Sequence, residues 1–156
     1  EGKTSNVRQC FSLEYNAENW SITTELRRAY FEPRYNVGGD QPSILPEGFY
    51  VQALIRPAEK WEAFLRYDQM VFDRHDRDGK AYAARIQPNL LPARDYDAFA
   101  KDITLGTAYR PNQAWLLRAE LHNVEGTMWA TLNDMPDRSE RTKYWNLAAF
   151  SASWRF

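Results

Sequence analysis

Long apolar runs are missing from this sequence. None of its 156 residues lies in a stretch that approaches the ~18 consecutive apolar residues of a membrane-spanning helix, and the mean hydropathy is -0.69. A chain that crosses a bilayer with β-strands escapes this test, because apolar and polar residues alternate along each strand. The absence therefore excludes helical membrane spans and leaves strand-built ones open.

Cysteine is almost absent, since Cys10 is the only one. An internal disulfide is therefore impossible, which argues against a disulfide-stapled secreted domain. Residues 1–10 are polar and lack the apolar core of a signal peptide. We expect an exported precursor to begin further upstream.

The chain also lacks an excess of either charge, because it has 20 Lys and Arg residues and 21 Asp and Glu residues. A balanced chain gives no electrostatic argument for nucleic acid, which requires a clustered basic face. His75 and His122 are the only histidines, and there is no Cys/His metal spacing and no Gly-rich phosphate loop. A hydrolase is an alternative, but no serine is marked as the partner of His122. We therefore expect no catalytic residue, no metal and no cofactor.

Alternation of apolar and polar residues with a period of two is the main positive signal, and it predicts β-strands with two different faces. It extends over residues 8–15, 20–30, 49–57, 61–71, 101–111, 114–124 and 144–156. Most of these segments are about 9–13 residues long, which suits a tilted membrane strand better than the mean soluble strand of about 5–6 residues.

The links between these segments alternate strictly between short and long. Residues 16–19, 57–60 and 111–113 are tight, turn-forming links. Residues 32–48, 72–100 and 125–143 are long and polar. Outer-membrane barrels have this alternation, because their periplasmic turns are short and their extracellular loops are long.

Aromatic residues make up 15% of the chain, and seven of them have the parity of the apolar face and lie beside a short link or the C-terminus: Tyr15, Trp20, Trp61, Tyr109, Trp115, Trp154 and Phe156. This row predicts an aromatic girdle at one membrane interface. Trp20 and Tyr30 lie on one strand, and at ~3.3 Å per residue and ~40° tilt they are about 25 Å apart, the height of a lipid-facing band.

These patterns predict an all-β fold, an antiparallel transmembrane β-barrel of the bacterial outer membrane, to which this chain contributes about seven C-terminal strands. A soluble β-rich binding domain is the alternative. Single-chain bacterial barrels have even strand numbers, and an open sheet would leave unpaired edges in lipid. We therefore expect residues 1–156 to be an incomplete part of one barrel domain, with further strands upstream of residue 1 or from another chain.

The end of the chain has apolar residues at alternate positions, Phe150, Ala152 and Trp154, before the terminal Phe156. This resembles the C-terminal signature of outer-membrane barrel proteins. The resemblance implies that the last strand is recognised by the barrel-assembly machinery, and that the partners include the lipid bilayer and lipopolysaccharide.

Residues 102–126, DITLGTAYRPNQAWLLRAELHNVEG, are similar to the penultimate hairpin of the phosphate-selective porin O and P family. GFYVQAL from Gly48 and RYD from Arg66 also look like those porins. The resemblance implies a trimeric, many-stranded diffusion channel whose selectivity depends on basic residues of the constriction. The chain has only five lysines, so no lysine cluster is carried over.

The polar faces of the strands are expected to line a water-filled lumen, because they carry too many charges to pack dry. The expected pore-lining residues are Glu25, Arg27, Arg56, Glu62, Arg66, Asp68, Arg110, Arg118, Glu120 and His122. Two readings are open for the arginines at positions 27, 56, 66 and 118. They form a cationic ladder that guides anions, or they pair with neighbouring acids and brace the wall.

The expected function is therefore a porin that allows passive diffusion of small hydrophilic solutes, anionic ones among them. A structural or export barrel whose lumen is occupied by a partner protein is the alternative. We expect an arginine at Leu65 or Leu117 to damage assembly and an arginine at Thr104 to be tolerated. Two loop hypotheses stay open: the acidic residues of 73–79 bind calcium or are a solvated tip, and residues 81–99 form a constriction, a subunit contact or a plain surface loop.

Overall fold

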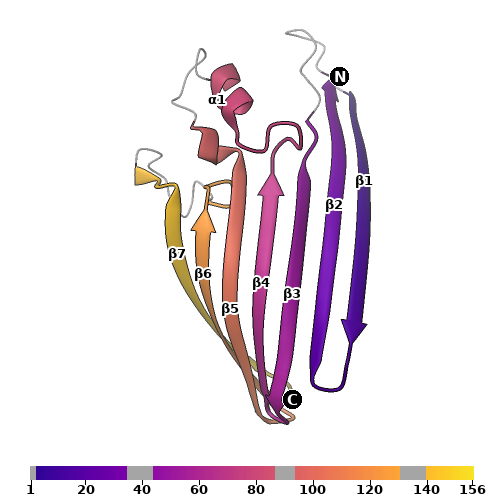
Figure 1. Ribbon diagram of the computed structural model, residues 1–156, viewed down its shortest axis with the longest axis vertical. Coiled ribbons are helices and arrows are strands. Elements are labelled where there is room, and N and C mark those ends of the chain that lie inside the picture. Colours follow the sequence, from indigo (N-terminus) through magenta and orange to yellow (C-terminus); the bar gives the residue numbers. More distant parts are fainter. Residues whose placement is uncertain (1–2, 35–43, 87–93, 131–139) are drawn as a thin grey trace.

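The computed structural model describes residues 3–34, 44–86, 94–130 and 140–156, and its central feature is one antiparallel sheet of seven strands (Figure 1). The order in the sheet follows the order in the chain. The strands are β1 (Lys3–Asn16), β2 (Trp20–Arg34), β3 (Glu47–Ala58), β4 (Trp61–Val71), β5 (Phe99–Asn112), β6 (Trp115–Glu125) and β7 (Tyr144–Trp154). The expectation of an all-β antiparallel fold is confirmed, and the sheet is a meander.

The expected strand boundaries differ from the observed ones mainly in the first hairpin. β1 begins at Lys3 rather than at residue 8, and β2 continues to Arg34. Lys3 pairs with Arg34 and the two strands stay in register down to the turn. Residues 3–6 are all polar, so the partner strand rather than an apolar alternation determines where this strand begins.

The sheet is open within the described residues. β1 pairs only with β2, and β7 pairs only with β6. The seven strands are therefore not closed into a barrel, and the transmembrane barrel expected from the sequence is observed only as an open sheet.

Short connections gather at one end of the sheet and long ones at the other, as Figure 1 shows. Only two residues separate β3 from β4, and two separate β5 from β6. The end with these connections is called the turn end below, and the opposite end is called the loop end. The strict alternation read from the sequence thus corresponds to two different ends of one sheet.

The three hairpin turns share one construction. The strands that leave the turn end, β2, β4 and β6, each begin with a tryptophan, which pairs with Ile55, Tyr109 and Trp154 respectively. Next to each pair the backbone N–H of an arginine donates to a backbone carbonyl of the turn. These bonds run from Arg56 to Asn19, from Arg110 to Lys60 and from Arg155 to Ala114, at 2.8 to 2.9 Å.

Two of these turns also contain a register shift, between Ile55 and Ala58 and between Tyr109 and Asn112. Each shift encloses an Arg-Pro dipeptide that ends in Pro57 or Pro111. Proline has no N–H to donate to the ladder, so it is accommodated where the pairing is interrupted.

The loop end carries a short helix, α1 (Lys80–Ile86), and a 3₁₀ turn, η1 (Asp95–Asp97). The Asp76 carboxylate accepts the backbone N–H groups of Ala81 and Tyr82, which caps the first turn of α1. The sequence pattern missed this helix because seven residues make only two turns, too few for a helical period to be recognised. No helix in the described residues is long and apolar enough to cross a membrane.

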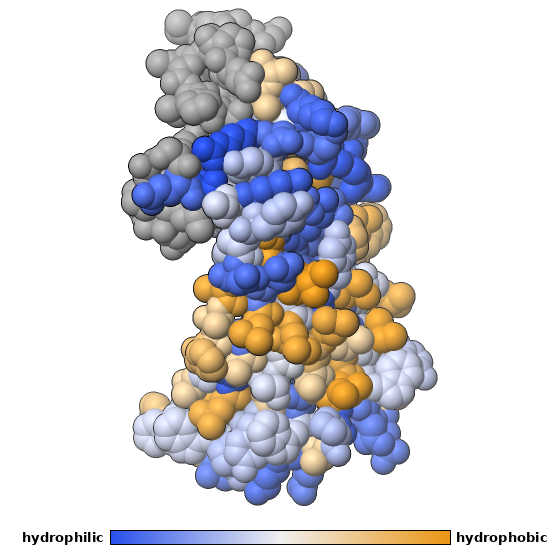
Figure 2. Space-filling view, turned by 60° about the vertical axis from the view of Figure 1, so that its left-hand side comes forward, coloured by the Kyte–Doolittle hydropathy of each residue, from blue (hydrophilic) through white to orange (hydrophobic). Residues whose placement is uncertain are grey.

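The two faces of the sheet are inverted relative to a water-soluble protein. Large apolar side chains lie exposed on one face, with Trp20 at 42%, Leu65 at 55% and Phe150 at 79% of full exposure. On the opposite face Thr104 is 0% and Asp102 2% exposed. Figure 2 shows the exposed apolar side chains as a band across the middle of the molecule, with charged residues above it.

A small apolar cluster lies at the loop end. Val71 pairs with Phe99 across β4 and β5, and both are buried. The segment after β6 covers them, since the Met128 N–H donates to the Phe99 carbonyl at 3.2 Å.

Packing on the polar face depends on one glycine. Gly106 on β5 lies opposite Phe64 on β4, and a Cβ atom at Gly106 would lie 2.1 Å from Cζ of the Phe64 ring. The ring therefore occupies the space that a side chain at position 106 would need.

We predict that Gly106→Val lowers the free energy of unfolding by about 1–3 kcal/mol, the usual cost of overpacking. Urea unfolding followed by tryptophan fluorescence measures this. Gly48→Ala is the matched control, because its nearest neighbours would lie at an ordinary 3.5 and 3.9 Å. A Gly106→Val protein as stable as the control would contradict this packing.

Candidate functional site

The register places the predicted pore-lining residues on one face of the sheet. Glu25 and Arg27 come from β2, Arg56 from β3, and Glu62, Arg66 and Asp68 from β4; Arg110 comes from β5, and Arg118, Glu120 and His122 come from β6. Rows of partners run across this polar face, for example Gln52, Arg66, Thr104 and His122 on four successive strands. The alternation in the sequence therefore predicts correctly that these residues share the polar face of the sheet.

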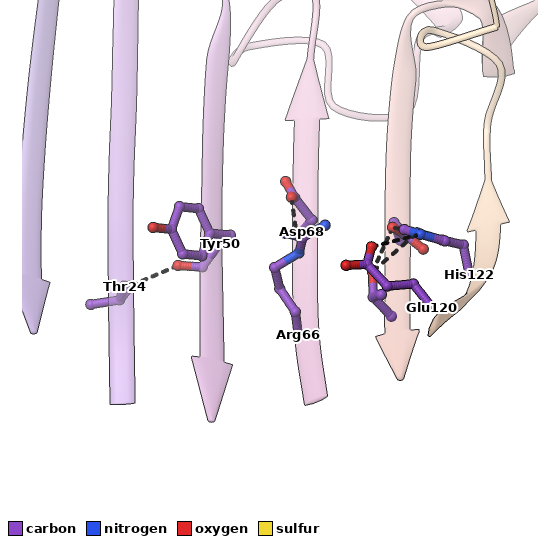
Figure 3. Close-up of polar contacts among 8 residues, drawn as sticks. Thr24, Tyr50, Arg66, Asp68, Glu120 and His122 are labelled. Carbon is purple, nitrogen blue, oxygen red and sulfur yellow. Dashed lines mark hydrogen bonds and ion pairs between the residues drawn. The ribbon is translucent and has the colours of Figure 1, made fainter. Parts of the chain in front are cut away.

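Two of the arginines pair with the acid two positions away on their own strand. Arg27 Nε contacts a carboxylate oxygen of Glu25, and Arg66 Nε lies 3.7 Å from Asp68 Oδ2 (Figure 3). The Arg27 side chain stays 72% exposed despite its pair. These pairs support the bracing reading for Arg27 and Arg66.

Near the turn end one carboxylate serves two arginines. Glu62 lies 3.8 Å from Arg56 on the one side and 3.8 Å from Arg110 on the other. Arg155 continues the same row, because its backbone bonds to the next turn. The polar face thus has more basic than acidic groups close to this end.

Arg118 does not form the pair with Glu120 that bracing requires. Glu120 instead lies 3.4 Å from Nε2 of His122, and the structure gives Arg118 no ion pair within the parts of the chain it describes. The Arg118 side chain is exposed. The bracing reading therefore does not hold for Arg118, whose guanidinium faces solvent.

His122 lies between two carboxylates. Its Nδ1 is 2.7 Å from Asp102 Oδ2, and its Nε2 faces Glu120 (Figure 3). The Thr104 hydroxyl donates to the same Asp102 oxygen at 2.8 Å. Asp102 and Thr104 are buried, so this network ties β5 to β6 at the centre of the polar face.

The network lacks the arrangement of a nucleophilic hydrolase. In such a set one histidine nitrogen takes the proton of the nucleophile while the other bonds the acid. Here both nitrogens of His122 face carboxylates, and the Thr104 hydroxyl, which also lies 3.2 Å from His122 Nδ1, is enclosed and donates to Asp102. The arrangement therefore joins β5 to β6.

One expectation about this face is wrong. Thr104 was expected to accept an arginine because it faces water, but its side chain is 0% exposed and bonded to Asp102. Parity gives the face of a residue correctly but does not report how closely its neighbours on a curved sheet pack over it.

The sequence did not single out Asp102 or Trp129. Asp102 has the polar-face parity of β5, so its position beside His122 could have been found by pairing the hairpin residue by residue. Trp129 lies outside the strands, and no periodic signal marks it. It reaches a cavity on the polar face of β1 to β4.

The seven girdle aromatics lie near the turn end and contact one another in groups. Ring centroids are 5.3 Å apart for Tyr15 and Trp20, 4.5 Å for Trp61 and Tyr109, 6.3 Å for Trp115 and Trp154, and 5.3 Å for Trp154 and Phe156. The row expected from the sequence is thus a physical row on the apolar face, and Figure 2 shows paler, less apolar side chains below the apolar band at this end of the molecule.

The acidic loop before α1 uses its carboxylates locally. Asp73 accepts the His75 N–H, Asp76 caps α1, and Asp78 bonds Lys80 at 2.7 Å. The hydrogen bond from Lys80 lowers the pKa of the Asp78 carboxyl, and in turn raises the pKa of Lys80. The described residues contain no group of three or more potential metal ligands.

The apolar part of the 81–99 loop, with Pro88, Leu90, Leu91 and Pro92, lies outside the described residues.

Comparison with known proteins gives no match, whether with protein-family models, curated proteins or solved structures. The function is therefore argued from the geometry of the chain.

We predict that Asp102→Ala lowers the free energy of unfolding by about 1–3 kcal/mol, because it leaves the buried Thr104 hydroxyl and His122 without their shared acceptor. Glu120→Ala should cost less than about 1 kcal/mol, because its contact with His122 is longer and partly exposed. Urea unfolding of both variants provides the comparison. Equal losses would show that the Asp102 network does not join the strands.

Proposed function

We propose that this chain forms part of a transmembrane β-barrel channel in a bacterial outer membrane, through which small hydrophilic solutes diffuse passively without catalysis or a cofactor. The observation that carries the proposal is the inversion of the two faces of the sheet. Large apolar residues lie exposed across one face, whereas most of the charged residues, together with buried polar ones such as Asp102 and Thr104, lie on the other.

Water is a poor solvent for such a surface. Leaving a large aliphatic or aromatic side chain exposed costs about 1.5–3 kcal/mol relative to burial. The exposed apolar side chains include Phe11, Leu65, Leu105, Leu121 and Phe150, from five strands. A patch that runs across a whole sheet exceeds what a soluble monomer tolerates, and hydrocarbon is the environment that suits it.

The aromatic row fits a membrane interface. Tryptophan and tyrosine rings gain from having an apolar body in lipid and a polar edge in water. The row lies beside the short turns, so the turn end is assigned to the periplasm and the loop end to the outside.

A bilayer also requires the sheet edges to be paired, since backbone N–H and C=O groups find no partner in hydrocarbon. β1 and β7 form the two edges and both run towards the turn end. Closure with antiparallel pairs alone therefore needs an odd number of additional strands. These come from a segment beyond residues 1–156 or from another chain, as in the many-stranded, trimeric porins that the sequence resembles.

The partners follow from this placement. Lys101 and Lys143 both contact Glu125, at 3.3 and 3.0 Å, beyond the apolar band at the loop end. Cations at this depth suit the phosphates of lipopolysaccharide. The terminal aromatic strand suits recognition by the barrel-assembly machinery.

Single-channel recording in planar bilayers tests the channel function. A porin gives steady openings that persist with the purified protein alone. Openings that appear only after a partner protein is removed would favour a plugged export barrel, and a protein that stays monodisperse in plain buffer would overturn the membrane assignment.

We predict that Phe150→Arg blocks membrane insertion while its neighbour Ser151→Arg does not. Phe150 is on the apolar face near the middle of β7, and Ser151 is on the polar face opposite Arg118. A charge at mid-bilayer depth on the lipid face costs about 2–4 kcal/mol. Heat-modifiable migration of folded protein in outer-membrane fractions measures insertion, and equal yields of the two variants would contradict the assignment of faces.

A further inference from the structure

The polar face carries a cavity of about 840 Å³ near the loop end, between β1, β2, β3 and β4. Ligand sites in proteins commonly have volumes of about 300–1,000 Å³. The residues around it include Arg8, Arg27, Arg66, Tyr50 and Trp129. Trp129 comes from the segment after β6, so the cavity joins strands that are distant from this segment in the sequence.

Four guanidinium groups, those of Arg8, Arg27, Arg28 and Arg66, and the three carboxylates of Glu25, Glu47 and Asp68 line this cavity. Glu25 pairs with Arg27, Glu47 pairs with Arg28, and Asp68 lies 3.7 Å from Arg66. Arg8 is exposed, and within the described residues no acid pairs with it. The excess is therefore one positive charge, located at Arg8.

Arg66 belongs to the wall of the cavity. Its Nε atom is enclosed and faces Asp68 Oδ2 at 3.7 Å, so Arg8 is the guanidinium that remains for a bound anion.

Aromatic rings supply the remaining surface. Tyr50 lies on β3 beside Asp68 of β4, as Figure 3 shows, and Trp129 provides an indole from the loop end. Flat rings pack against aromatic faces in stacked or edge-on geometry. The cavity thus combines an anion-binding group with a surface for a planar ring.

We propose that this cavity is a solute-binding site for molecules that carry one carboxylate and one planar ring. Arg8 holds the carboxylate by charge-assisted hydrogen bonds, which guanidinium groups form in a two-pronged geometry, and Trp129 packs against the ring. The inference rests on the proposed function in that the cavity is reached from the channel lumen, and it names the solute class for which the channel is selective.

The test is a ¹⁹F NMR titration of the purified full chain in detergent with three probes. 4-Fluorobenzoate has both features, 4-fluorobenzylamine has the ring with the opposite charge, and fluoroacetate has the carboxylate without the ring. We expect concentration-dependent line broadening and a measurable Kd for 4-fluorobenzoate, with binding of the other two probes at least about tenfold weaker.

Two variants and one control locate the site. Arg8→Gln should weaken 4-fluorobenzoate binding about tenfold through the lost charged hydrogen bond, and Trp129→Leu about fivefold through the lost ring contact. Arg118→Gln is the control, because Arg118 is exposed on the same face but does not line the cavity. Far-UV circular dichroism checks that each variant retains its sheet.

Equal binding of the three probes, or an equal loss in the Arg8→Gln and Arg118→Gln proteins, would overturn the proposed site. Such a result together with steady single-channel openings would leave the channel function intact. Selective binding of 4-fluorobenzoate without any conductance would support the binding site and contradict the channel function.

Discussion

Alternation of side chains along each strand is the constraint on which the rest of this structure depends. Because successive residues point to opposite sides, one pairing register brings most large apolar side chains to one surface and most charges to the other. A slip by one residue between β4 and β5 would put Leu65 opposite Thr104 and lose both surfaces at once. The exposed apolar side, the aromatic row and the charged side therefore follow from a single register.

Most of the sheet could be predicted from the sequence because its signals repeat. Seven alternating segments and three pairs of short and long links gave all seven strands, and the parity of residues such as Leu65 and Arg66 gave their faces. The beginning of β1 was missed because residues 3–6 are all polar, so no apolar alternation marks a segment that the structure pairs with β2.

The contacts within the polar face were less predictable. Parity puts His122, Glu120 and Arg118 on one surface but does not decide which partner each takes, and here His122 rather than Arg118 takes Glu120. Trp129 depends on how the segment after β6 folds back over β5, through hydrogen bonds such as that from Met128 to Phe99. Side-chain choices of this kind depend on three-dimensional neighbours, which no periodicity records.

The repeated corner at the turn end has a consequence for how such a sheet changes in size. In each hairpin the strand after the turn begins with a tryptophan. The turn residue just before it accepts a backbone hydrogen bond from an arginine of the next hairpin, as Asn19 does from Arg56 and Lys60 does from Arg110. Neighbouring hairpins are thus shifted relative to each other by the same distance along the strand direction. Inserting or deleting one whole hairpin would preserve every remaining shift, so this architecture gains or loses circumference two strands at a time.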